Sequence, residues 1–167
     1  MATITLRGQT INTIGDLPRV GNPAPGFTLQ NAKLKDKTLA SFSGKKVLLN
    51  ILPSLDTPVC AKSTKTFNER AAGRDDGVML VISADLPFAQ GRFCGMEKIK
   101  HMQPLSMMRS RRFAKDYGVL MVDGPLAGLT ARAVVVIDEN GRVIYTELVN
   151  DVTHEPDYDA ALAALTE

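Results

Sequence analysis

The stretch that decides the fold is Val47–Cys60, which reads Val-Leu-Leu-Asn-Ile-Leu-Pro-Ser-Leu-Asp-Thr-Pro-Val-Cys. Its beginning, Val47–Leu52, is apolar almost throughout, a pattern typical of a central strand covered on both faces. Pro58 suits the first position of a helix and Gly73 suits its end, so we expect a helix between them. A second apolar run, Val78–Ser83, predicts another strand. These elements predict a βαβ unit with parallel strands.

The N-terminal part of the chain predicts a small β-hairpin. Thr3–Leu6 and Gln9–Asn12 alternate apolar and polar residues on either side of Arg7 and Gly8, which is the pattern of two strands joined by a turn. Residues 27–29 and 38–39 predict short extended pieces further along. We therefore expect extra strands ahead of the βαβ unit.

Two helices, a second hairpin and a last helix are expected after the βαβ unit. The helices are predicted over Pro87–Lys100, which contains Gly91 and Gly95, and over Ser106–Tyr117, with Ser106 as a cap. Strands are predicted over residues 133–137 and 143–149, joined by a turn at 138–141. Pro156 opens the final helix, which has an apolar stripe at helical spacing.

This order of elements is the thioredoxin arrangement, preceded by extra N-terminal strands. We expect an α/β protein with a thioredoxin-like fold: a central mixed β-sheet flanked by helices, with an N-terminal β-hairpin extension over residues 1–14. The chain of 167 residues contains no internal repeat, low-complexity tract or linker that would divide it. A chain of this length can bury a hydrophobic core of its own, so we expect a single domain over residues 1–167.

The composition is that of an ordinary soluble globular protein. The hydrophobic fraction is 44%, the charged fraction 23% and the formal net charge +2. Basic clusters at residues 33–37 and 109–112 have no interleaved aromatic residues, which argues against nucleic-acid binding. No signal peptide or membrane-spanning run is recognised, so we expect a cytoplasmic location and no membrane association. Thiols are normally reduced there, which favours catalytic or redox-sensing cysteines over a structural bridge.

Cys60 falls in the first turn of the helix predicted to begin at Pro58, with Thr57 as its N-cap. A helix N-terminus offers unpaired backbone N–H groups and the positive end of the helix dipole, and both favour a thiolate over a thiol. A thiolate is the form of cysteine that attacks an O–O bond. From this position alone, a buried structural thiol is an equally good interpretation of Cys60.

The residues around Cys60 resemble the active-site signature of the peroxiredoxins, Pro-x-x-x-Thr-x-x-Cys, here Pro53, Thr57 and Cys60. The longer string Pro-Ser-Leu-Asp-Thr-x-x-Cys is similar to that of the bacterial thiol peroxidases, which are atypical two-cysteine peroxiredoxins. Residues 83–94 and 131–138 resemble the same subfamily, so the resemblance covers nearly the whole chain.

The resemblance implies a role for each matching residue. Cys60 would be the peroxidatic cysteine, Thr57 would hydrogen-bond the peroxide and the thiolate, and Pro53 would shield the site. Arg132 would complete it, because a guanidinium keeps its proton and can stabilise both a thiolate and the charge on a leaving oxygen. Without the resemblance, a surface charge at the start of a strand is the favoured interpretation of Arg132.

The resemblance also implies a catalytic cycle that uses Cys94, the only other cysteine. Attack on hydrogen peroxide or an organic hydroperoxide would leave Cys60 as a sulfenic acid, which would condense with Cys94 as the resolving cysteine. Thioredoxin would then reduce the intramolecular Cys60–Cys94 disulfide. The protein would need no cofactor, would form a homodimer and would serve antioxidant defence. A disulfide requires Cα atoms about 4.4–6.8 Å apart, so we expect residues 87–100 to unwind partly when it forms.

Other classes of protein are less well supported. The absence of Cys-x-x-Cys argues against a dithiol reductase, and His101 and His154 lack metal-ligand spacing with a cysteine, so no metal is expected. Two alternatives remain open: a redox sensor that uses the same cysteine pair to signal to a partner, and a non-catalytic thioredoxin-fold binding domain. A buried core thiol is the alternative interpretation of Cys94.

Overall fold

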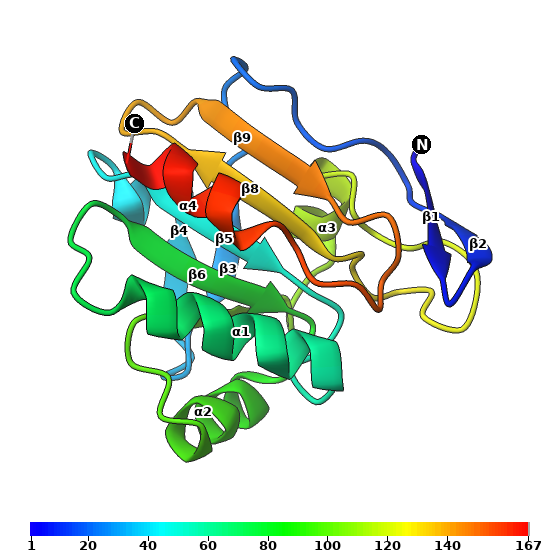
Figure 1. The fold of residues 1–167 in the computed structure, drawn as a ribbon, viewed down its shortest axis with the longest axis horizontal. Coiled ribbons are helices and arrows are strands. Elements are labelled where there is room, and N and C mark those ends of the chain that lie inside the picture. Colours follow the sequence, from blue (N-terminus) through cyan, green and yellow to red (C-terminus); the bar gives the residue numbers. More distant parts are fainter. Residues whose placement is uncertain (167) are drawn as a thin grey trace.

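The computed structural model describes residues 1–166 and contains a mixed β-sheet with helices on both faces (Figure 1). Within these residues the main sheet has the strand order β4-β3-β7-β6-β5-β8-β9, and β1 and β2 form a separate two-stranded sheet. The strands are β1 Thr3–Leu6, β2 Gln9–Asn12, β3 Thr28–Gln30, β4 Asp36–Thr38, β5 Val47–Ile51, β6 Val78–Ser83, β7 Gln103–Ser106, β8 Ala133–Ile137 and β9 Val143–Leu148. The helices are α1 Pro58–Ala71, α2 Pro87–Met96, α3 Arg112–Asp116 and α4 Tyr158–Thr166, with a 3-10 turn at Leu39–Phe42. The predicted thioredoxin-like α/β fold with its N-terminal hairpin is confirmed.

The predicted βαβ unit forms the centre of the sheet. Every residue of β5 is buried, and β5 pairs in parallel with β6, from Val47 opposite Val78 to Ile51 opposite Ile82. Helix α1 begins at Pro58, as predicted. Because the carboxyl ends of β5 and β6 lie at the same edge of the sheet, the loops that follow them can meet there.

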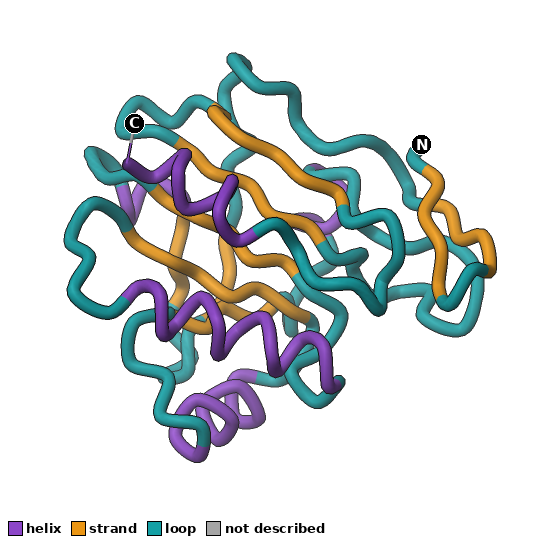
Figure 2. Tube along the Cα trace, viewed as in Figure 1, coloured by secondary structure: helices purple, strands orange, loops and turns teal. Residues whose placement is uncertain are grey.

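Helices cover both faces of the sheet, as Figure 2 shows in purple against the orange strands. Helices α1 and α4 pack on one face, where Phe67 and Leu165 join a buried apolar cluster with Leu48. Helix α3 covers the other face through Phe113, which belongs to the second large cluster. The N-terminal hairpin stands at the end of the molecule toward which β5, β6 and β9 point (Figure 1). Among residues 1–166, no helix is both long and apolar enough to span a bilayer.

The prediction of a helix over Ser106–Tyr117 is wrong for the first half of that segment. The segment contains only the short helix α3, and Ser106 is the last residue of β7 rather than a helix cap. Strand β7 pairs in parallel with β6 and antiparallel with β3, so pairing with distant segments overrides the local pattern. The Ser106 hydroxyl donates a hydrogen bond to the carbonyl of Asp85, which ties the end of β7 to the loop after β6.

The helix predicted over Pro87–Lys100 is also shorter in the structure, because α2 ends at Met96. Lys98 adopts a left-handed φ of 54°, and the N–H of Ile99 donates to the carbonyl of Cys94 at 2.9 Å, which closes the last turn. The remaining predicted elements are confirmed to within about two residues: the N-terminal hairpin, β3, β4, β8, β9 and α4.

Candidate active site

Cys60 is the third residue of α1 and lies in the first turn of that helix. Thr57 precedes the helix in an extended conformation, and its carbonyl accepts the first helical hydrogen bond, from Ala61 at 3.0 Å. The N–H groups of Val59 and Cys60 therefore have no partner within the helix. The Cys60 side chain is fully buried, so its sulfur experiences the helix N-terminus with little screening by water.

Arg132 lies just before β8 and reaches the sulfur of Cys60. Its Nη2 donates a hydrogen bond to Cys60 Sγ at 3.2 Å, across 72 residues of sequence. Both Nη2 and Nε also donate to the carbonyl of Val152, at 2.9 and 3.1 Å, which fixes the plane of the guanidinium. Arg132 is 1% exposed, so its interpretation as a surface charge is wrong. Its Nη1 is buried and has no hydrogen-bond partner within the described residues, which leaves the two N–H groups of this nitrogen available as donors.

Thr57 and Pro53 lie on the loop between β5 and α1. The hydroxyl of Thr57 donates to the carbonyl of Ser54 at 2.9 Å and makes no capping hydrogen bond, although Thr57 occupies the N-cap position. With its proton engaged there, the hydroxyl oxygen keeps lone pairs that can accept a hydrogen bond. Pro53, on the same loop, is buried. The expected bond between Thr57 and the sulfur is not among the hydrogen bonds of the structure.

A pocket of about 620 Å³ brings these residues together. Its lining combines site residues with apolar and polar side chains of distant segments: Leu6, Arg7, Pro53, Thr57, Pro58, Val59, Leu126, Arg132, Val152 and Thr153. Arg132 both lines this pocket and contacts the sulfur, so it connects the pocket to the buried Cys60. The structure thus gathers Cys60, Thr57, Pro53 and Arg132 at one place.

Asp85, which the sequence does not single out, fixes the loop that carries Pro53 and Thr57. Its carboxylate accepts hydrogen bonds from the Ser54 hydroxyl and the Leu55 N–H, each at 2.7 Å, and from the Ser83 hydroxyl at 2.8 Å. Asp85 lies just before α2, the helix that bears Cys94. A single carboxylate therefore joins the loop before Cys60 to the start of the Cys94 helix.

Cys94 lies apart from this site. It is half-buried on α2, and burial raises the pKa of its thiol to about 11, so it is a neutral thiol at physiological pH. Both cysteines are free in the structure. Cys94 packs on the edge of the apolar cluster to which Cys60 belongs, so the two approach the same core from different helices.

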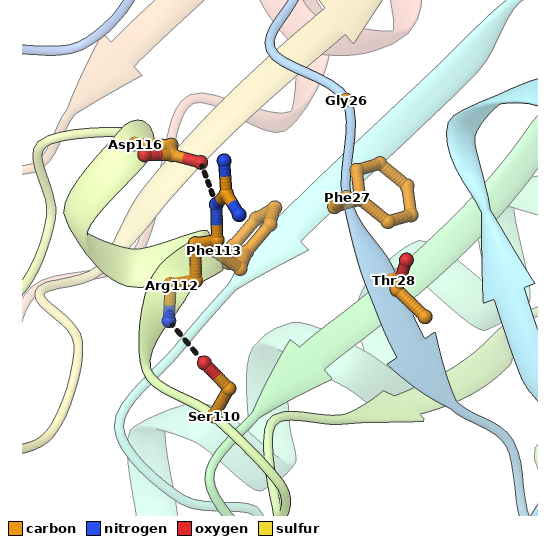
Figure 3. Close-up of a pocket in the computed structure, with 7 residues that line it drawn as sticks. All are labelled: Gly26, Phe27, Thr28, Ser110, Arg112, Phe113 and Asp116. Carbon is orange, nitrogen blue, oxygen red and sulfur yellow. Dashed lines mark hydrogen bonds and ion pairs between the residues drawn. The ribbon is translucent and has the colours of Figure 1, made fainter.

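A second hollow, of about 300 Å³, lies between β3 and α3 (Figure 3). The rings of Phe27 and Phe113 meet edge to face there, with centroids 5.6 Å apart. Its charged groups, Arg112 and Asp116, are paired with each other at 3.4 Å. Neither cysteine lines this hollow, so it is not a candidate site for thiol chemistry.

Comparison with known proteins identifies the family to which the chain belongs. The family model described as Redoxin matches residues 19–162. The thiol peroxidases of Mycobacterium bovis and Mycobacterium tuberculosis are 57% identical over 165 residues, which cover 99% of this chain and 99% of theirs. A crystal structure of a peroxiredoxin-like protein from Aquifex aeolicus has a TM-score of 0.94 and 38% identity, covering 99% of this chain and 96% of that one. The thiol peroxidase from Chromobacterium violaceum has a TM-score of 0.91 and 27% identity over the same shares.

The fold, the cysteine at the start of α1 and the family match define a thioredoxin-like protein of the redoxin family. Within that family, the chain belongs to the bacterial thiol peroxidases of the peroxiredoxin group, and it is accordingly an oxidoreductase of the peroxidase class.

Proposed function

We propose that this protein reduces hydrogen peroxide and organic hydroperoxides, with the thiolate of Cys60 as the nucleophile. The observation that carries the proposal is the hydrogen bond from Arg132 Nη2 to Cys60 Sγ within a buried site. A buried guanidinium is costly unless an anion accompanies it. No ion pair within 4 Å joins Arg132 to a carboxylate among the described residues. The Glu155 carboxylate interacts with its charge from a longer distance, and the Cys60 sulfur is the group placed in direct contact to be that anion.

In the first step, the Cys60 thiolate attacks the terminal oxygen of the hydroperoxide, ROOH. An S–O bond forms as the O–O bond breaks, so the sulfur loses two electrons and becomes a sulfenic acid. The departing RO⁻ takes a proton from water and leaves as ROH. Negative charge thus moves from the sulfur to the leaving oxygen, and a fixed cation between the two positions stabilises the transition state.

The side chains of the pocket fit this step. The Thr57 hydroxyl donates a hydrogen bond to the carbonyl of Ser54, so its oxygen is free to accept a hydrogen bond from the O–H of the hydroperoxide and orients it. Nη1 of Arg132, which is buried without a partner, supplies a donor for the leaving oxygen. Pro53 is buried beside them and restricts access of water to the sulfur.

Cys94 completes the cycle. Its thiol condenses with the sulfenic acid of Cys60, which forms a disulfide within the chain and releases water. A dithiol reductant of the thioredoxin type supplies the two electrons and two protons that restore both thiols. We further propose a cytoplasmic location, where such a reductant maintains the thiols, and a role in antioxidant defence.

We also propose that the protein is a homodimer. Leu86, Phe88 and Met96 expose 54%, 65% and 69% of their surface, which is unusual for large apolar side chains that remain in water. They border a groove of about 680 Å³ between α2 and the start of α1, and a second copy would cover this apolar surface.

The test is consumption of hydrogen peroxide with thioredoxin, thioredoxin reductase and NADPH. We expect Cys60→Ser to abolish turnover with every hydroperoxide. The matched variant Cys94→Ser should consume one equivalent of peroxide and then stall, because no resolving thiol remains. Turnover by Cys60→Ser within tenfold of the parent would remove Cys60 from the reaction, and sustained thioredoxin-dependent turnover by Cys94→Ser would remove Cys94.

A further inference from the structure

Part of the wall of the peroxide pocket comes from the N-terminal hairpin and from the loop after β9. Leu6 and Arg7, at the tip of the hairpin, line the pocket together with Val152 and Thr153 of the loop. Arg7 and Gly8 adopt left-handed φ values of 50° and 83°, so the turn is tight and defined. The hairpin lies outside the main sheet. It is positioned by apolar contacts with Met121, Ala131 and Val152 and by hydrogen bonds to residues 120–123 and to the loop after β9.

Asp151 makes the decisive contacts between the hairpin and the loop. One carboxylate oxygen accepts hydrogen bonds from the Thr5 hydroxyl and, at 3.1 Å, from the Gly8 N–H of the hairpin. The other accepts from the N–H and hydroxyl of Thr153 in the loop, at 2.9 and 2.6 Å. Asp151 is 6% exposed, and these hydrogen bonds hold the pKa of its carboxyl far below the usual range.

The same contacts reach the sulfur through Val152. The N–H of Val152 donates to the carbonyl of Thr5 at 2.9 Å, and its carbonyl accepts the hydrogen bonds that orient Arg132. The N–H of Val152 is therefore bound to the hairpin, and its carbonyl binds the guanidinium that contacts Cys60. Asp151 is the direct neighbour of Val152. By binding the hairpin and the loop, it fixes the wall that they form and also the Val152 carbonyl that accepts from Arg132.

We propose that the N-terminal hairpin is a specificity-determining wall of the pocket for bulky apolar hydroperoxides, and that Asp151 is the positioning residue that holds this wall in place. The inference rests on the proposed function. Leu6, Val59, Leu126 and Val152 give the pocket an apolar lining above the reactive groups. The substituent of an organic hydroperoxide lies against that lining, whereas hydrogen peroxide has no substituent to contact it.

The test compares Asp151→Asn with Asp123→Asn, with cumene hydroperoxide and hydrogen peroxide as substrates. Asp123 holds the other strand of the hairpin through the N–H and side-chain amide of Asn12, at 2.9 and 2.8 Å, and does not line the pocket. The side-chain amide in Asp151→Asn would keep one acceptor oxygen and place an NH₂ group against the donors that the other oxygen binds. We expect the ratio of kcat/KM for cumene hydroperoxide over hydrogen peroxide to fall about tenfold in Asp151→Asn, the scale of a lost apolar contact in a pocket. In Asp123→Asn the ratio should stay within about twofold.

An unchanged ratio in a folded Asp151→Asn protein would overturn the proposal, because a purely structural role lowers both rates together. An equal fall in Asp123→Asn would also overturn it, since the effect would then belong to the hairpin as a whole and not to the contacts of Asp151. If Asp151→Asn does not fold, Thr5→Val removes a single donor and should lower the ratio about threefold; no change there overturns the proposal as well. Failure of the parent protein to consume either peroxide would instead contradict the proposed function.

Discussion

Replacing Arg132 by Met tests the centre of the mechanism, because it removes the charge and the donors while keeping a long side chain in the buried space. A hydrogen bond to a charged group contributes about 1.5–3 kcal/mol. The bond from Nη2 to Cys60 Sγ is 3.2 Å long and fully buried, so this range applies to it. At about 1.4 kcal/mol for each factor of ten, the ratio of thiolate to thiol at Cys60 should fall roughly tenfold to hundredfold.

The second-order rate with peroxide should fall by more than the thiolate population does. Removing a donor from the developing oxyanion of a transition state costs on the order of 10²–10³ in rate. This second loss should persist at a pH where Cys60 is fully ionised in both proteins. Arg132→Lys keeps the charge without the fixed pair of donors, so it should restore much of the thiolate population and less of the rate.

The measurements use a Cys94→Ser background, so that Cys60 is the thiol that titrates. Absorbance of the thiolate at 240 nm gives its population against pH, and quenched-flow trapping of the sulfenic acid gives the rate. Arg132→Met leaves the buried carbonyl of Val152 without the guanidinium donors, so the Tm of the variant is measured as well, and the rates are compared at a temperature where both proteins are folded. Unchanged titration together with an unchanged rate would place Arg132 outside the reaction.

Three further outcomes are expected. In Cys60→Ser, alkylation of Cys94 by iodoacetamide should rise about tenfold per pH unit up to pH 10, because burial raises the thiol pKa to about 11; in urea it should level off near 9. The stabilisation of α2 by this buried neutral thiol is present below pH 9 and lost as pH rises toward 11. Oxidation should speed amide hydrogen exchange in residues 87–100, and equal protection in both redox states would contradict unwinding. Asp85→Asn should slow sulfenic acid formation about tenfold and speed exchange at Ser54 and Leu55; a normal rate would reduce Asp85 to a structural role.

The sequence predicts the parts of the fold that depend on local pattern. The apolar runs of β5 and β6, and Pro58 and Gly73 around α1, are local signals, and these elements lie where expected. Strand β7 was not predictable in this way, because it is short, contains Pro104 and exists through pairing with β6 and β3. Long-range pairing supplies the stability that its own residues lack.

The residues of the candidate site also differ in whether a local sequence pattern predicts them. Cys60 and Thr57 follow from the helix start and the motif around them. Arg132 required the resemblance, since nothing local indicates that a residue 72 positions away turns inward to the sulfur. Asp85 and Asp151 were not predicted at all. Their partners lie about 30 and 146 residues distant, and an isolated aspartate in a loop carries no signal of such a partner.

The two cysteines differ in how firmly each is held, and this difference indicates which one moves. Cys60 lies on α1, whose Phe67 is fully buried against the sheet, and Arg132 fixes its sulfur. Helix α2 contains Gly91 and Gly95, each of which costs a helix about 1 kcal/mol relative to alanine. Its buried polar attachments are near its start, where the Gln90 amide donates to the Ser83 hydroxyl and the Leu105 carbonyl. The polar contacts beyond its end are exposed: the Lys65–Glu97 ion pair, and hydrogen bonds from the N–H groups of residues 100 and 101 to Asn68. The second half of α2 carries Cys94 and ends at the exposed Met96, and the left-handed residue Lys98 follows two residues later. We expect unwinding from that end to release Cys94 while the start of α2, joined through Asp85 to the loop before Cys60, stays in place. In the proposed cycle, the Cys94 thiol would then reach the sulfenic acid of Cys60 without disturbing the pocket in which that sulfenic acid forms.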